Sequence, residues 1–137
     1  RGGEMRRLTL ALCLMLSSCN TTPAIAASLD HDQVTKAIMG EAGGQDYSEK
    51  LAIACAIRNR GTLRGVYGLN SKTSYPPEVW QESGKAWAES EYHDVTGGAS
   101  HWLSNWDLEH SRASLIAWRY SMKETLRTEN FTFYKAK

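Results

Sequence analysis

Two adjoining stretches decide the fold of this chain: residues 38–45, Ile-Met-Gly-Glu-Ala-Gly-Gly-Gln, and residues 51–60, Leu-Ala-Ile-Ala-Cys-Ala-Ile-Arg-Asn-Arg. The first completes a predicted helix that Asp30 or Asp32 can cap and that the Gly-Gly pair ends. The second is apolar on nearly every side, with Gly61 placed to end the helix. Such a segment predicts the buried central helix of a small domain.

One charged residue interrupts the apolar face of the first helix. Val34, Ala37 and Ile38 have the i, i+3, i+4 spacing of a core-facing stripe. Glu41 follows Val34 by seven residues, about two helical turns, and therefore lies about 20° from it on the same stripe. Burial raises the pKa of a carboxyl, and a carboxyl protonated near neutral pH can act as a general acid. The alternative is a helix-end glutamate that turns to solvent or pairs with an arginine of residues 58–60.

After the central helix, the chain is predicted to form a loop and a third helix. Glycine, serine, asparagine and threonine are frequent in residues 62–75, which predicts a loop. Pro77 suits the first turn of a helix that runs to about Glu91. This helix places Trp80 and Trp87, seven residues apart, on one face, and both are expected in the core.

The C-terminal third is predicted to hold a loop, a last helix and a strand. Residues 92–107 are expected to form the loop. The helix is expected around three apolar residues, Leu115, Trp118 and Met122, with Trp118 also in the core. Residues 130–134 predict a short strand, with a hairpin to residues 121–126 as one option. The expected class is α+β, mainly α, with a short β element near the C-terminus.

Residues 5–27 have the pattern of an export signal. Two arginines follow the first methionine, and an apolar run to Leu16 is too short to span a bilayer. Two cleavage sites compete: a lipobox ending in Cys19, which would become the lipidated N-terminus, and an Ala-x-Ala site at residues 24–26. The lipobox is preferred because it explains the cysteine. We expect an exported protein, either a periplasmic or outer-membrane lipoprotein or a secreted one, with its folded domain at residues 28–137.

Composition excludes several functional classes. The 137 residues carry a net charge of +1 without a run of like charges, which argues against a nucleic-acid partner. Three cysteines are too few for a disulfide framework, and Cys55 is expected to be a small core residue. The four histidines lack the spacing of a zinc site, so neither a metal nor a cofactor is expected.

Further blocks along the chain carry a family resemblance. Residues 86–91 read Ala-Trp-Ala-Glu-Ser-Glu, residues 94–102 read Asp-Val-Thr-Gly-Gly-Ala-Ser-His-Trp, and Phe-Tyr-Lys closes the pattern at 133–135. Together with the two opening stretches, they resemble the cell wall hydrolases that include the spore-cortex-lytic enzymes (SleB type). The resemblance spans residues 33–135 and keeps the order of the family's blocks.

The resemblance implies a small lysozyme-like domain that cleaves peptidoglycan between N-acetylmuramic acid and N-acetylglucosamine. The family's catalytic glutamate corresponds to Glu41. It implies a lytic transglycosylase with a single acid and no cofactor, acting as a monomer on peptidoglycan strands. Muramidase-type hydrolysis is the alternative and requires a second carboxylate from among four candidates, Asp46, Glu49, Asp94 and Asp107. A peptidoglycan-binding lipoprotein without activity, or a structural lipoprotein without a glycan ligand, would also fit the export signal.

Five further residues are candidate substrate contacts: Tyr47, Thr96, Gly97, His101 and Trp102. The glycine loop before His101 can bring backbone N–H groups close to a sugar, and an indole ring offers an apolar face to a pyranose. The chain departs from the family pattern at two positions. Leu103 stands where relatives often carry an acid, and Phe131 stands where they often carry histidine. These departures leave open an inactive homologue.

Overall fold

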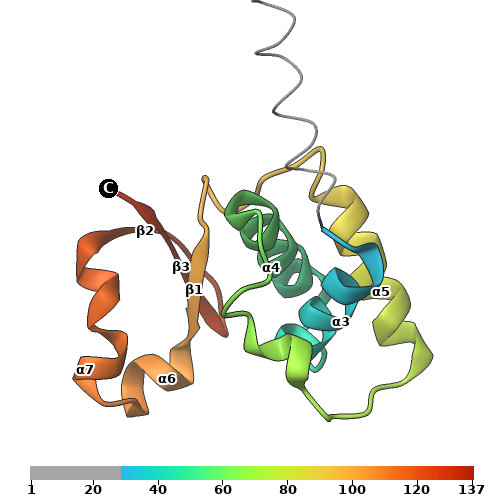
Figure 1. The fold of residues 1–137 in the computed structure, drawn as a ribbon, viewed down its shortest axis with the longest axis horizontal. Helices are drawn as coiled ribbons and strands as arrows, with labels where there is room; N and C mark the ends of the chain where they lie inside the picture. Colours follow the sequence, from blue (N-terminus) through green and yellow to red (C-terminus); the bar gives the residue numbers. More distant parts are fainter. Residues whose placement is uncertain (1–28) are drawn as a thin grey trace, which may run out of the picture.

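The computed structural model describes residues 29–137. The predicted signal peptide, its cleavage sites and Cys19 therefore lie outside the described residues. Figure 1 shows a small sheet standing between two groups of helices, with α3, α4 and α5 on one side and α6 and α7 on the other. In the described part of the chain, no helix is long and apolar enough to cross a membrane.

The first two helices form where the sequence predicts them. α3 spans His31–Ala42, and the Asp30 side chain caps it by accepting a hydrogen bond from the Asp32 N–H. α4 spans Tyr47–Arg60 and is capped by Asp46, which accepts from the Glu49 N–H at 3.2 Å. Gly61 ends α4 in the left-handed conformation, φ 74°. The apolar run of α4 is buried from end to end, as expected for a central helix.

The connection after α4 contains a short helix that the sequence analysis missed. η1 spans Tyr67–Asn70, within the predicted loop, and packs against α3. It is a single turn without a side-chain cap, so it carries no periodic signal. α5 spans Pro77–Glu89, begins at the predicted proline and packs against both α3 and α4.

The sheet has three antiparallel strands in the order β1-β3-β2. β2 spans Met122–Arg127 and β3 spans Phe131–Ala136, and they form the predicted hairpin with an irregularity between Glu124 and Leu126. β1 spans His101–Ser104 and pairs with the other side of β3. Phe131 and Phe133 belong to the core cluster that includes α4, so one face of the sheet packs on the helices.

Two predictions for the C-terminal third are wrong. Residues 92–107 are not all loop, because they contain β1 and the start of α6, Asn105–His110. The expected last helix is broken into α7, Ala113–Ile116, and η2, Ala117–Ser121. Met122 begins a strand because pairing with β3 outweighs the helical spacing of the apolar residues.

The tryptophans expected in the core divide between three environments. Trp87 is buried in the core cluster, which confirms its assignment. Trp80 is 38% exposed, so its placement in the core is wrong. Trp118 is half-buried in η2 and lines a surface hollow instead of the core. Helical spacing identifies a face of a helix, but it does not tell whether another element covers that face. Cys55 is buried, as predicted.

Candidate active site

Glu41 lies in the last turn of α3, half-buried, at a cleft of about 690 Å³. The cleft separates the helical side of the molecule from the sheet edge and the segment beyond it. Arg60 and Tyr67 line it on the helical side, and His101 and Trp102 line it from β1. Asp107, Ile116 and Trp118 close it from α6, α7 and η2. We call this hollow the Glu41 cleft.

A backbone hydrogen bond fixes the Glu41 side chain. The Gly68 N–H in η1 donates to Glu41 Oε1 at 3.2 Å. The contact depends on a very close approach between η1 and α3. A Cβ on Gly40 would clash with the Gly68 carbonyl, and one on Gly68 would lie 2.6 Å from the Ala37 carbonyl oxygen and from Glu41 Cγ. Because neither Gly40 nor Gly68 has a side chain, η1 can come close enough to α3 for the Gly68 N–H to hold the carboxyl.

The pKa of Glu41 is raised above its usual value, mainly because burial disfavours the charged form. The negative charge of Asp107 acts in the same direction. The hydrogen bond from Gly68, the Trp102 side chain and the positive charge of Arg60 oppose the shift. Glu41 therefore keeps its proton to a higher pH than an exposed glutamate does, which is the property that a general acid requires.

The structure separates the four candidate second carboxylates. Asp107 lines the Glu41 cleft, and its carboxylate accepts from the Ser104 hydroxyl at 2.8 Å. Asp46 is exposed and occupied as the cap of α4, and Glu49 is buried in the first turn of the same helix. Asp94 accepts hydrogen bonds within its own loop. Among these four, only Asp107 lines the cleft that holds Glu41.

Two of the five predicted substrate contacts lie in the cleft. Trp102 and His101 both line it, and the Arg60 guanidinium carbon stands 5.9 Å from the centre of the Trp102 ring. The pKa of His101 is lowered, first by burial and then by the positive charge of Arg60. Both effects favour the neutral imidazole, which can donate one hydrogen bond and accept another.

The other three predicted contacts are not brought to the cleft. Tyr47 is half-buried at the start of α4, where its hydroxyl donates to Glu89 Oε1 at 3.1 Å. Thr96 is fully buried, and its hydroxyl donates to Asp94 Oδ1 at 2.6 Å. Gly97 takes a positive φ of 66° in the same loop. These residues support the framework around the cleft and do not line it.

The loop before β1 is held by a compact hydrogen-bond network. Asp94 accepts from the backbone N–H groups of Thr96 and Gly98, each at 2.9 Å. The Asn59 side chain donates to Asp94 Oδ2 at 3.0 Å and to the Ala99 carbonyl at 2.9 Å. The end of α4 thus sets the position at which β1 starts, and with it the positions of the two cleft residues of β1.

A second hollow, of about 450 Å³, adjoins the Glu41 cleft. Glu41, Ser104 and Phe131 line both, so the carboxyl stands where the two meet. Trp106 is 66% exposed, lines the second hollow and stacks on His110 with ring centres 4.4 Å apart. We call it the Trp106 hollow. Glu41 is therefore reached from two hollows, one on each side of it.

Both departures from the family pattern fall in the Glu41 cleft. Leu103 and Phe131 are among its lining residues. Both side chains are apolar, and the Glu41 carboxyl keeps its contact with the Gly68 N–H beside them. These two residues therefore affect which ligand the cleft can bind more than they affect the Glu41 carboxyl.

Sequence reasoning missed several residues of the cleft. From the sequence, Arg60 is predicted only as a possible ion-pair partner of Glu41, residues 67 and 68 fall in a predicted loop, and Trp118 is predicted in the core. The glycine at position 68 gives no signal by itself, because its role appears only when η1 is placed against α3. Within residues 29–137, no group of three or more histidine, cysteine, aspartate or glutamate side chains is placed to hold a metal ion.

Comparison with solved structures identifies the fold. The catalytic domain of the SleB protein of Bacillus cereus matches with a TM-score of 0.53 at 18% identity, over 77% of this chain and 88% of that one. The catalytic domain of the germination-specific lytic transglycosylase SleB from Bacillus anthracis matches with a TM-score of 0.52 at 20% identity, over 77% and 93%. No protein-family model matches the chain, and no curated protein matches it significantly. The fold implied by the sequence motifs, mainly α with a small sheet, is therefore confirmed.

Proposed function

We propose that this protein cleaves peptidoglycan glycan strands as a lytic transglycosylase, with Glu41 as its catalytic acid. The observation that carries the proposal is the placement of Glu41. The Glu41 side chain is half-buried, accepts a hydrogen bond from the Gly68 N–H and lies where two surface hollows meet. Its pKa is raised by burial. The fold is shared with a domain described as that of a germination-specific lytic transglycosylase, which supports the same reaction.

In the proposed reaction, one carboxyl serves both steps. Protonated Glu41 donates its proton to the oxygen between N-acetylmuramic acid and N-acetylglucosamine, and the bond from C1 to that oxygen breaks. The sugar passes through an oxocarbenium-like state. The Glu41 carboxylate then accepts the proton of the muramic acid C6 hydroxyl, whose oxygen bonds to C1. The product is a 1,6-anhydro sugar, no water is consumed, and Glu41 is protonated again.

Hydrolysis is the second candidate, and the position of Asp107 favours it. Asp107 lines the same cleft as Glu41 and is held by Ser104 and Ser111. A second carboxylate of this kind activates water or stabilises the sugar cation in hydrolytic glycosidases. The products distinguish the reactions, because hydrolysis gives a reducing muramic acid that is heavier by one water than the anhydro form.

The test is mass spectrometry of muropeptides released from purified sacculi. The wild-type protein is expected to release anhydro-muropeptides, and Glu41→Gln to reduce their rate of release by about 10²–10⁴-fold, the usual contribution of a general acid. Asp32→Asn is the matched control, since it removes an exposed carboxylate from the first turn of the same helix. Folded wild-type protein that binds sacculi but releases nothing would identify a peptidoglycan-binding protein without activity instead.

We also propose that the protein acts outside the cytoplasm. The export signal at residues 5–27 and the location of peptidoglycan support this placement. Anchoring through a lipidated Cys19 is the preferred form, and cleavage at residues 24–26 is the other. Metabolic labelling with a radioactive fatty acid tests the anchor: label is expected in the wild-type chain and absent from Cys19→Ala.

A further inference from the structure

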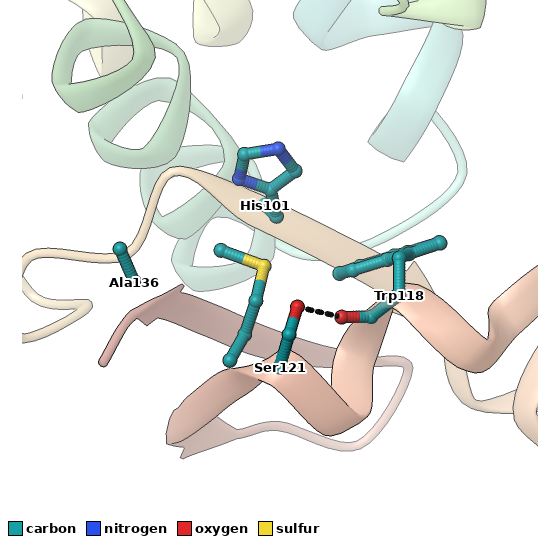
Figure 2. A pocket seen from close by; sticks show the side chains of 5 residues that line it. His101, Trp118, Ser121 and Ala136 are labelled. Atoms are coloured by element: carbon teal, nitrogen blue, oxygen red, sulfur yellow. Dashed lines mark hydrogen bonds between the residues drawn. The ribbon is translucent and has the colours of Figure 1, made fainter.

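A third hollow, of about 520 Å³, lies beyond the Glu41 cleft on the side away from the Trp106 hollow. Figure 2 shows the side chains around it: His101 from β1, and Trp118 and Ser121 from η2. Met122 and Ala136, which pair across β2 and β3, complete the lining. Its volume falls within the range of about 300–1,000 Å³ that is usual for small-molecule sites. We call it the distal hollow.

The distal hollow is continuous with the Glu41 cleft. His101 and Trp118 line both, so a ligand that fills the cleft and extends past these two rings enters the distal hollow. The hollow lies on the face of the sheet that carries His101, Tyr134 and Ala136, opposite the face that packs on α4. The three hollows thus form one series, and Glu41 stands between the first and the second.

The Trp118 ring is fixed before any ligand arrives. It lies 5.5 Å from the buried Tyr134 ring in an edge-on arrangement at 80° and 5.6 Å from the His101 ring at 48°. The Ser121 hydroxyl donates to the Trp118 carbonyl at 2.8 Å, which closes the turn that carries the indole (Figure 2). An aromatic ring held in this way presents an apolar face with little loss of side-chain freedom on binding.

The lining selects against a charged occupant. It consists of an indole, a thioether, a methyl group, a hydroxyl and one imidazole, and it contains no carboxylate, ammonium or guanidinium group. A stem peptide carries carboxylates and amines, which gain nothing from this lining and lose hydration on entering it. An N-acetylated pyranose is neutral, with an apolar ring face and an acetyl methyl group that suit the indole, thioether and methyl of this surface.

We propose that the distal hollow binds a further N-acetylated sugar of the same glycan strand whose bond Glu41 cleaves. The proposal rests on the proposed function, because it takes the cleft to hold the strand near the scissile bond. It makes the protein selective for strand length: strands long enough to reach past Trp118 gain a contact that shorter ones lack.

The test uses peptide-free glycan strands, prepared from peptidoglycan with an amidase and separated by length. For the wild-type protein, kcat/KM is expected to rise with strand length and then level off. Ala136→Trp fills the distal hollow from an exposed position at the end of β3. We expect it to lower kcat/KM on long strands by about fivefold or more, the scale of a lost aromatic contact, and to leave short strands unaffected. Lys123→Trp is the matched control, an exposed residue of β2 outside the lining.

Binding gives a second readout that does not depend on cleavage. In the Glu41→Gln protein, peptide-free strands are expected to shift the NMR signal of the Trp118 indole N–H, with affinity rising with length. Ala136→Trp in that background should remove the length dependence. This result supports the distal hollow even if the wild-type protein cleaves nothing, an outcome that would count against the proposed function alone.

Three outcomes would overturn the proposal. Ala136→Trp could match the wild-type protein at every length, which would show that the hollow is not used. It could lower kcat/KM equally at every length, which would indicate a structural effect. Its effect could be confined to strands that carry stem peptides, which would identify the peptide as the occupant.

Discussion

At the residue scale, the environment that suits Glu41 to acid chemistry also destabilises the fold. Burial against η1 removes water from the carboxyl and raises its pKa, and the backbone N–H of Gly68 offsets only part of the lost hydration. Such conflicts between stability and activity are typical of catalytic positions. The conflict can be measured separately from the reaction.

Glu41→Gln is expected to raise stability at neutral pH. The pKa of Glu41 is higher in the folded than in the unfolded state, so its contribution to stability is complete below the unfolded pKa and is lost as pH rises through the folded pKa. Glutamine keeps the acceptor for Gly68 and carries no charge. We expect a gain of about 0.5–2 kcal/mol at pH 7 that disappears in acid. Urea unfolding at both pH values measures it, and a loss of stability at pH 7 would contradict the prediction.

Two neighbouring charges should move the pH profile of activity in opposite directions. Asp107 raises the pKa of Glu41, so Asp107→Asn should shift the alkaline limb of kcat/KM to lower pH. Arg60 lowers that pKa, so Arg60→Met should shift the limb to higher pH. The measurement is kcat/KM against pH on one soluble glycan substrate. Shifts of the same sign in both variants would show that another group controls the limb.

The sequence predicts Glu41 as the candidate acid, but it predicts only some of the residues that line the Glu41 cleft. Glu41 could be identified because its helical position conflicts with its charge, and this needs no tertiary information. His101 and Trp102 could be named as candidates because a hydrogen-bonding imidazole and an indole directly after a glycine loop suit a sugar. Trp118 has helical spacing like that of Trp87, which is buried, yet it lines the cleft. Whether an apolar side chain is covered depends on elements far away in the sequence.

At the element scale, the contact between α3 and η1 connects the fold to the site. η1 is one turn long and packs against α3. Gly40 and Gly68 allow the two elements to approach closely, and this approach brings the Gly68 N–H to the Glu41 carboxyl. The helices around it could be predicted because capping residues, a proline and a glycine mark their ends. β1 could not, since all four of its residues are half-buried and show no alternation.

Gly68→Ala is expected to damage the site through this contact. The added Cβ would lie 2.6 Å from the Ala37 carbonyl oxygen, Glu41 Cγ and the Glu41 backbone nitrogen, so η1 must move away and its N–H must leave Glu41. We expect a stability loss of about 1–3 kcal/mol, the usual cost of overpacking, together with a loss of muropeptide release. Thermal unfolding and product analysis measure both.

Gly44→Ala provides the control for this prediction. Gly44 lies in the turn after α3, where a Cβ meets nothing within 4 Å and φ is not positive. The substitution should therefore be neutral or should stabilise the fold by up to about 1 kcal/mol, because alanine lowers the conformational entropy of the unfolded chain. Equal losses in the two variants would show that the close approach of η1 is not what makes Gly68 necessary.

At the scale of the whole molecule, the sheet determines how the site is divided. Glu41 and Arg60 come from the helices on one side, and Asp107 and Trp118 come from the segment on the other side. β1 lies between them (Figure 1). Its Trp102 ring is 5.9 Å from the Arg60 guanidinium carbon, and its His101 ring is 5.6 Å from the Trp118 ring. The cleft therefore requires both parts of the described chain, and a fragment ending before α6 would lack the wall formed by α6, α7 and η2.

Residues 28–137 are accordingly expected to fold as one cooperative unit. The core cluster runs from Val34 to Phe133, with Leu29 packed against it, and all three hollows are lined from within this range. A chain of residues 28–137 should unfold in one cooperative transition at the same temperature as the full chain, as small single domains do. It should also release the same muropeptides from sacculi. Calorimetry and product analysis of the two chains compare them directly, and a lower midpoint or a second transition in the shorter chain would show that residues 1–27 contribute to the folded domain.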